Sequence, residues 1–241
     1  MNNSVLILGA TSDVGKALAL HYSKMGYAII LAARNTNEVQ TYIQDWSSKQ
    51  IQVVPFEATD FAGHQAWVKN LPLLPTISIC VFGYLGDHEK ARTNWSEAHR
   101  IIDANYTGAV SILNRLALEY EKQGSGCIVG ISSVAGDRGR QSNYFYGSAK
   151  AGFTAYLSGL RNRLFHKGVH VLTVKPGFIN TSMTAGLKLP KPITASADQV
   201  ATRIISAVQR KRNTIYVLSA WFWIMLVIRN IPEFIFKKLK L

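Results

Sequence analysis

Short apolar runs alternate with longer amphipathic stretches along the first 218 residues of this chain. Most of the runs are apolar throughout instead of alternating with polar residues, which is typical of strands that helices cover on both faces of a parallel sheet. We expect strands at 5–9, 27–33, 51–56, 77–82, 127–132 and 169–175, with a final strand within 215–218. The amphipathic stretches predict helices at 14–25, 37–49, 95–122, 144–166 and 197–210.

Repeated strand–helix–strand units of this kind predict an α/β fold of the Rossmann type, a doubly wound parallel sheet of about seven strands. The 241 residues suffice for one domain with a sizeable core. Hydrophobic residues make up 48% of the chain and charged residues 17%, a balance that excludes a disordered protein. We therefore expect one folded domain over 1–218 and an apolar helical extension over 219–241.

The two cysteines, Cys80 and Cys127, lie inside expected strands, which is typical of reduced core residues. No spacing of cysteine and histidine indicates a metal site. Only Met1, Asn2 and Asn3 precede the first apolar run, and none of them is basic. Because this pattern lacks the features of a secretory signal, we expect the domain to stay in the cytoplasm.

The first expected strand runs into the sequence GATSDVG, residues 9–15, and then into a helix. Glycines at such a turn let backbone N–H groups approach a pyrophosphate at the helix N-terminus. The candidate cofactor contacts here are Gly9, Thr11, Ser12, Asp13, Val14 and Gly15. The alternative is an ordinary turn that Ser12 or Asp13 caps. A carboxylate at position 13 is unfavourable near phosphates unless it turns away to cap the helix.

Arg34 follows the second expected strand, in a segment (LAAR, 31–34) that contains no acid. A basic residue at this point pairs with the 2′-phosphate of NADP, whereas an acid binds the ribose hydroxyls of NAD. NAD(P)H is therefore the expected cofactor, and Arg34 favours NADPH. Stacking of the guanidinium on adenine is an open alternative.

Tyr146 and Lys150 are four residues apart on an expected helix, so they share a face. An ammonium beside a phenol lowers the phenol pKa from about 10, which predicts that Tyr146 is a general acid near neutral pH. Ser133 ends the fifth expected strand, where its hydroxyl can hold a substrate oxygen. Together the three residues predict hydride transfer between a nicotinamide cofactor and a carbonyl. The alternative for Tyr146 and Lys150 is an exposed helical pair.

These motifs, in this order, resemble the short-chain dehydrogenase/reductase family over residues 4–218. The resemblance implies that Tyr146 is the acid and base, that Lys150 binds the nicotinamide ribose, and that Ser133 orients the carbonyl. It also implies that Asn105 positions a water in the proton relay. Further implied cofactor contacts follow the third, fourth and sixth strands: Glu57, Ala58, Gly83, Pro176, Gly177, Ile179 and Thr181. The family's usual Asn-Asn-Ala-Gly reads CVFG at 80–83, so the support of the adenosine half differs.

The net charge of +13 is unevenly placed. Eight basic residues and one acid after residue 202 give that part of the chain a net charge of +7. Because these charges flank an uncharged apolar run at 215–228, they favour an anionic membrane surface over nucleic acid. The run is shorter than the roughly 20 residues that span a bilayer. We expect 219–241 to form a helical hairpin in the interface, at the cytoplasmic face of the inner membrane. A homodimer or homotetramer surface is the alternative.

Within the family, the chain resembles the reductases that convert decaprenylphosphoryl-2-keto-erythro-pentose into decaprenylphosphoryl-arabinofuranose. The resemblance lies in residues 9–15, 82–87, 135–143, 146–148 and 229–239. This resemblance implies a polyprenyl-phosphate-linked keto sugar as substrate and a flavin-dependent oxidase as partner. Arg138 and Arg140 follow Ser133 closely and are candidates to bind the lipid phosphate, because guanidinium groups suit such oxyanions. Solvated loop charges are the alternative.

Two other functions stay open. One is a short-chain reductase of a soluble or hydrophobic ketone, of the acyl or steroid type, in which the C-terminal segment is a dimer surface or a lid. The other is a non-catalytic nucleotide-sensing or scaffold protein on the same fold. The intact set of Ser133, Tyr146 and Lys150 argues against the second.

Overall fold

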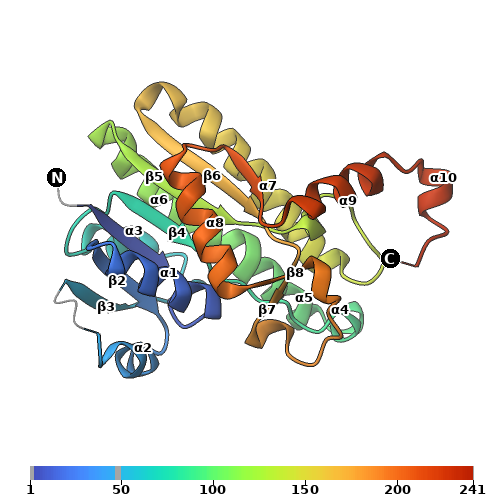
Figure 1. Ribbon diagram of the computed structural model, residues 1–241, viewed down its shortest axis with the longest axis horizontal. Helices are drawn as coiled ribbons and strands as arrows, with labels where there is room; N and C mark the ends of the chain where they lie inside the picture. The colour runs from blue at the N-terminus through green and yellow to red at the C-terminus, as the bar shows by residue number, and fades with distance from the viewer. Residues whose placement is uncertain (1–2, 47–49, 241) are drawn as a thin grey trace.

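A seven-stranded parallel sheet organises the molecule, which we describe from a computed structural model covering residues 3–46 and 50–240. The strand order is β3-β2-β1-β4-β5-β6-β9 (Figure 1). The chain crosses from β3 back to β4 beside β1, so the order reverses there, as in a doubly wound Rossmann sheet. The strands are β1 (Ser4–Leu8), β2 (Ala28–Ala33), β3 (Ile51–Pro55), β4 (Ile77–Cys80), β5 (Gly126–Ile131), β6 (Val169–Lys175) and β9 (Thr214–Tyr216).

Helices cover both faces of this sheet, which explains why its strands are apolar throughout. Successive side chains of a strand point to opposite faces. In β1, Val5 and Ile7 accordingly pack with α1 (Asp13–Lys24), α2 (Thr36–Ile43) and α8 (Ala197–Gln209), while Leu6 and Leu8 pack on the other side. That second face is covered by α3 (His64–Lys69), α6 (Gly108–Gln123) and α7 (Tyr144–Leu164). The predicted fold class is confirmed.

The expected helix at 95–122 is confirmed in extent, but a π-helical turn interrupts its α-helical hydrogen bonding. The chain forms α5 (Trp95–Ile102), a π-helical turn (Asp103–Thr107) and then α6. The expected helix at 37–49 is too long, because α2 ends at Ile43; residues 47–49 lie outside the described part of the chain. Short elements carry too few residues for a periodic pattern, and sequence analysis missed α3, α4 (His88–Thr93) and the two-stranded pair β7 (Phe178–Asn180) and β8 (Thr194–Ser196).

The C-terminal segment follows β9 as α9 (Ser219–Asn230) and a short α10 (Glu233–Phe236), which project from one end of the molecule (Figure 1). One side of α9 packs on the domain through Trp221 and Met225, which are 4% and 0% exposed. Within residues 3–46 and 50–240, none of the helices has the length and apolar character needed to cross a membrane.

Candidate active site

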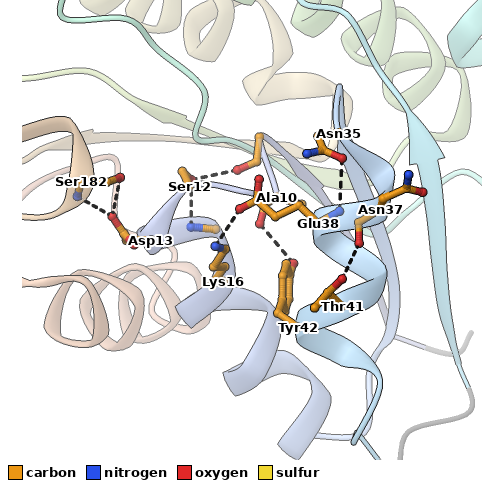
Figure 2. Close-up of polar contacts among 12 residues, drawn as sticks. Ala10, Ser12, Asp13, Lys16, Asn35, Asn37, Glu38, Thr41, Tyr42 and Ser182 are labelled. Atoms are coloured by element: carbon orange, nitrogen blue, oxygen red, sulfur yellow. Dashed lines mark hydrogen bonds and ion pairs between the residues drawn. The ribbon is translucent and has the colours of Figure 1, made fainter.

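The glycine turn after β1 can be built only with glycines at its two ends. Gly9 has φ +99°, and a Cβ there would lie 2.7 Å from the Phe82 backbone nitrogen. A Cβ on Gly15 would lie 2.5 Å from the Gly9 carbonyl oxygen. The Ser12 hydroxyl donates to that carbonyl and accepts from the Gly15 N–H, so Ser12 is the helix N-cap (Figure 2). The first turn of α1 is therefore held close to the carboxyl end of β1.

Asp13, which stands where the family pattern has a glycine, does not cap α1. Its carboxylate accepts hydrogen bonds from the Ser182 backbone N–H at 2.7 Å and from the Ser182 hydroxyl at 2.9 Å (Figure 2). Ser182 follows β7 and lies 169 residues further along the chain. The Asp13 carboxylate therefore points toward the loop after β7 and ties that loop to the glycine turn, instead of capping α1.

A cavity of about 600 Å³ lies against this turn at the carboxyl ends of β1 to β4. Of the predicted cofactor contacts, those that line it are Gly9, Thr11, Ser12, Arg34, Glu57, Ala58 and Gly83. Lining residues that sequence analysis missed include Phe82, Tyr84, Arg100, Asp103, Ser182 and Met183. The last four come from α5, from the π turn and from the loop after β7, whose proximity to the glycine turn depends on the folded topology.

Arg34 and Glu57 line the cavity where β2 and β3 end, at the side of the sheet away from β5 and β6. Arg34 is exposed and has no ion pair among the residues described. One Glu57 oxygen accepts from the backbone N–H and the hydroxyl of Thr59, at 3.0 and 2.8 Å. The Arg34 guanidinium is therefore available to bind an anion, whereas one oxygen of the Glu57 carboxylate already accepts two hydrogen bonds from Thr59.

Ser133, Tyr146 and Lys150 come from two neighbouring elements. Ser133 follows β5, and its hydroxyl accepts from the Ala135 N–H at 3.1 Å. Tyr146 and Lys150 lie on consecutive turns of α7, and the Lys150 Nζ is 5.7 Å from the centre of the Tyr146 ring. The same Nζ donates to the Ile131 carbonyl at 3.0 Å. Lys150 is thus fixed between the end of β5 and the tyrosine.

The expected lowering of the Tyr146 pKa is wrong for this arrangement. Burial raises the pKa of Tyr146 to about 12, and the nearby Ser133 hydroxyl only partly opposes the rise. Burial also lowers the pKa of Lys150 to about 8. Burial, which penalises the charged phenolate, is the physical reason for the difference. Tyr146 is consequently a neutral phenol at pH 7, the form that donates a proton.

Asn105 lies within the π turn that interrupts the helix, and such turns are frequent at functional sites. Its side-chain nitrogen donates to the carbonyls of Tyr84 and Ile101, at 2.6 and 2.8 Å, and its oxygen accepts from the Tyr84 N–H. A Cβ on Gly83 would lie 2.8 Å from that oxygen and 3.5 Å from the Lys150 Nζ. The Asn105 side chain therefore braces the segment after β4 next to Lys150.

The segment after β6 reaches the same region. The Pro176 carbonyl accepts from the Val134 N–H at 3.0 Å, which joins it to the residue after Ser133. Ile179 packs against the core, and the Thr181 N–H donates to the Thr184 hydroxyl. A Cβ on Gly177 would lie 1.9 Å from the Trp221 ring, so α9 sits directly against this glycine. The C-terminal segment thus packs against Gly177, one of the predicted cofactor contacts.

The family model described as short chain dehydrogenase matches residues 3–191. An uncharacterized oxidoreductase of Mycobacterium tuberculosis is 32% identical over 243 residues, covering 98% of this chain and 96% of the relative. The chain belongs to the short-chain dehydrogenase family. An uncharacterized oxidoreductase of Streptomyces coelicolor is 31% identical and covers 98% and 95% of the two chains. The expectation of an NAD(P)H-dependent oxidoreductase is confirmed.

Solved structures with NADP or NADPH bound share the fold. ElxO with NADP bound superposes with a TM-score of 0.80 at 21% identity, covering 92% of this chain and 100% of that one. A short-chain dehydrogenase from Sphingobium yanoikuyae in complex with NADPH has a TM-score of 0.79 at 22% identity, covering 96% and 97%. In this short-chain dehydrogenase, side chains at positions 9 and 15 would fill the cradle at the start of α1, so the turn fits a dinucleotide phosphate.

The two arginines after Ser133 have different surroundings. Arg138 donates to the carbonyls of Arg229 and Ile231, at 2.9 and 3.0 Å, and forms an ion pair with Glu233 at 2.7 Å. Its guanidinium also lies 4.0 Å from the centre of the Phe236 ring. These contacts use both terminal nitrogens of Arg138 to hold α9 and α10, and sequence analysis missed this role.

Arg140, by contrast, has few polar partners. Its Nη2 lies 3.2 Å from the Met225 sulfur, a weak acceptor, and its Nε is buried with no hydrogen-bond partner among the residues described. Burial lowers the pKa of Arg140, and the charge of Asp137 opposes this shift. Met225 in turn packs on Val134, next to Ser133. Arg140 is therefore an incompletely paired cation in the loop that follows Ser133.

Sequence analysis also missed a buried ion pair between Asp137, which precedes Arg138, and Lys175 of β6. The Asp137 carboxylate binds the Lys175 Nζ at 2.5 Å and accepts from the Tyr216 hydroxyl at 2.6 Å. The Asp137 and Lys175 side chains are 3% and 10% exposed. Because Lys175 precedes Pro176, the pair joins the loop after Ser133 to the ends of β6 and β9.

Proposed function

We propose that this enzyme uses NADPH to reduce a ketone carried by a phosphate-bearing lipid, and that the ketone is the 2-keto group of a polyprenyl-phosphate-linked pentose. The observation that carries the substrate class is Arg140, an incompletely paired guanidinium within the loop that joins Ser133 to Tyr146. The likeness of residues 82–87 and 135–143 to the keto-pentose reductases supports the sugar. A flavin-dependent oxidase that forms the ketone is the partner that this reaction requires.

In the proposed reduction, the cofactor and three side chains each have a separate role. The nicotinamide supplies a hydride to the carbonyl carbon when it is bound. Tyr146, with a pKa of about 12, carries its proton at neutral pH and donates it to the carbonyl oxygen, which completes the alcohol. Ser133 holds that oxygen by a hydrogen bond. The cationic Lys150 stabilises the phenolate left on Tyr146 until a proton returns from solvent.

The preference for NADPH rests on Arg34. It is exposed beside the cavity, and it has no ion pair within 3–46 and 50–240. A phosphate on the adenosine ribose offers it a charge-assisted, bidentate partner. ElxO and the Sphingobium yanoikuyae enzyme, which have the same fold, are described with NADP and NADPH respectively.

Replacement of Arg140 by alanine tests the substrate class. The KM for a polyprenyl-phosphoryl keto-pentose should rise about tenfold or more, the loss expected for a hydrogen bond to a charged group. The KM for a neutral ketone of similar size should stay within twofold, roughly the scatter of one weak contact. Arg210→Ala, which removes an equal charge from the exposed end of α8, is the matched control. Arg138 must stay intact in this test, because its loss would also release α9.

A reductase of a hydrophobic, uncharged ketone is the second candidate, favoured by the apolar inner side of α9. Trp221 and Met225 pack against Gly177 and Val134, which places an apolar helix beside the residue that follows Ser133. Equal losses of activity on the phosphate-bearing and the neutral ketone in Arg140→Ala would select this function over the one proposed.

A further inference from the structure

The C-terminal helices present an apolar surface that nothing in the described chain covers. We define the outer face as Phe222, Trp223, Leu226, Val227, Phe234 and Ile235. Trp223, Val227 and Phe234 are 64%, 65% and 64% exposed. The opposite side of α9 carries the buried Trp221 and Met225. Soluble monomers rarely expose contiguous apolar patches of this kind, and such patches mark interaction sites.

This outer face has a fixed orientation on the domain. Arg138 binds two carbonyls at the junction of α9 and α10, the Glu233 carboxylate and the Phe236 ring. The Trp221 Nε1 donates to the Ile193 carbonyl at 2.9 Å. The two helices are therefore attached at both the start of α9 and the start of α10, and they project from one end of the molecule (Figure 1) with these apolar side chains exposed.

The charges around the outer face identify its partner. The segment from 229 to 240 carries Arg229, Lys237, Lys238 and Lys240, and its single acid, Glu233, is already paired with Arg138. Two copies meeting through this face would bring like charges together. An anionic bilayer neutralises them instead, because its negative surface potential attracts basic residues. Tryptophan and phenylalanine beside lysine are also the residues favoured at the headgroup boundary.

We propose that the outer face of α9 and α10 docks the enzyme on an anionic bilayer surface. The twelve residues of α9 lie along this surface instead of spanning it. Since the inner side of the same helix packs on Gly177 and Val134, docking places the active site next to the bilayer. The docking surface does not depend on the substrate proposed above, and it can be tested without any substrate.

Sedimentation of the full-length protein with phosphatidylcholine vesicles, with and without phosphatidylglycerol, is the test. The wild type should bind the anionic vesicles at least tenfold more tightly than the neutral ones. Trp223→Ser combined with Val227→Ser should reduce binding to anionic vesicles at least tenfold. Trp95→Ser on α5, which removes a tryptophan of similar exposure (68%) elsewhere, should leave binding unchanged.

Three results would overturn the proposal. The first is failure of the wild type to bind either kind of vesicle. The second is equal loss in Trp95→Ser, which would mean that any exposed tryptophan suffices. The third is a wild-type dimer, seen by light scattering, that the Trp223→Ser and Val227→Ser variant converts to a monomer without any change in vesicle binding; the outer face would then join two copies. Circular dichroism of each variant separates these outcomes from unfolding.

Discussion

The Asp137–Lys175 pair is expected to hold the catalytic loop, and Asp137→Asn tests it. Both side chains are almost fully buried and their charged atoms are 2.5 Å apart, so solvent screens the interaction little. Removing one partner of such a pair costs about 3–5 kcal/mol, because the other charge is left buried. Asparagine keeps a polar group for Tyr216, which places the expected loss at about 3 kcal/mol.

That loss corresponds to a fall in melting temperature of about 6–12 °C for a chain of this size. Thermal unfolding followed by circular dichroism measures it. The double variant Asp137→Asn, Lys175→Met should recover part of the stability, because no unpaired charge remains. Glu89→Gln, which breaks the exposed pair with Arg92, is the control and should change the unfolding free energy by less than about 1 kcal/mol.

Activity provides a second readout that a purely structural role would not move. The same variant should lower kcat about tenfold below its melting temperature, since the loop after Ser133 loses its attachment to β6, while KM for NADPH should hold. Effects of the two single substitutions that simply add in the double variant would refute the coupling. So would an Asp137→Asn protein as stable as the wild type.

Three further outcomes are expected. Burial lowers the pKa of Lys150 from 10.5 to about 8, so between these pH values only the unfolded chain holds the proton and the unfolding free energy rises with pH. Denaturant titrations at several pH values should show this rise in the wild type and not in Lys150→Met. The same pH dependence in both proteins would contradict it. Arg34→Asp should lower kcat/KM for NADPH about tenfold to hundredfold and spare NADH, a ratio that steady-state kinetics with both cofactors measures; an unchanged ratio would remove Arg34 from the cofactor site. Asp13→Ala should speed hydrogen exchange at residues 182–187, because Ser182 loses its acceptor, and unaltered exchange there would show that the contact does not hold the loop.

Sequence analysis succeeded where one local pattern determines the geometry. The turn from Gly9 to Gly15 and the spacing of Tyr146 and Lys150 depend on neighbours in the chain, and strands with no polar alternation indicate a sheet covered on both faces. The structure places these residues as the patterns imply.

The remaining features depend on contacts between distant segments. Arg138 contacts residues 91 to 95 positions further along the chain. Its hydrogen bonds to the segment of α9 and α10 could not be predicted from the sequence of the charged loop in which it lies. The same holds for Asp13 and Ser182. The pKa of Tyr146 depends on how much protein surrounds the phenol, which residue spacing does not report. The π turn at Asn105 escaped because the helical pattern on its two sides continues in the sequence.

In the reaction that we propose, Tyr146 protonates a ketone on a phosphate-bearing lipid while NADPH supplies the hydride. The most direct measurement is NADPH oxidation by the full-length protein with a polyprenyl-phosphoryl 2-keto-pentose, followed by identification of the lipid product. We expect one alcohol to form per NADPH consumed. We also expect turnover to be at least about a hundredfold slower in Tyr146→Phe, which is about the contribution of general acid catalysis. Unimpaired turnover in Tyr146→Phe, or reduction of a neutral ketone with none of the lipid-linked one, would contradict it.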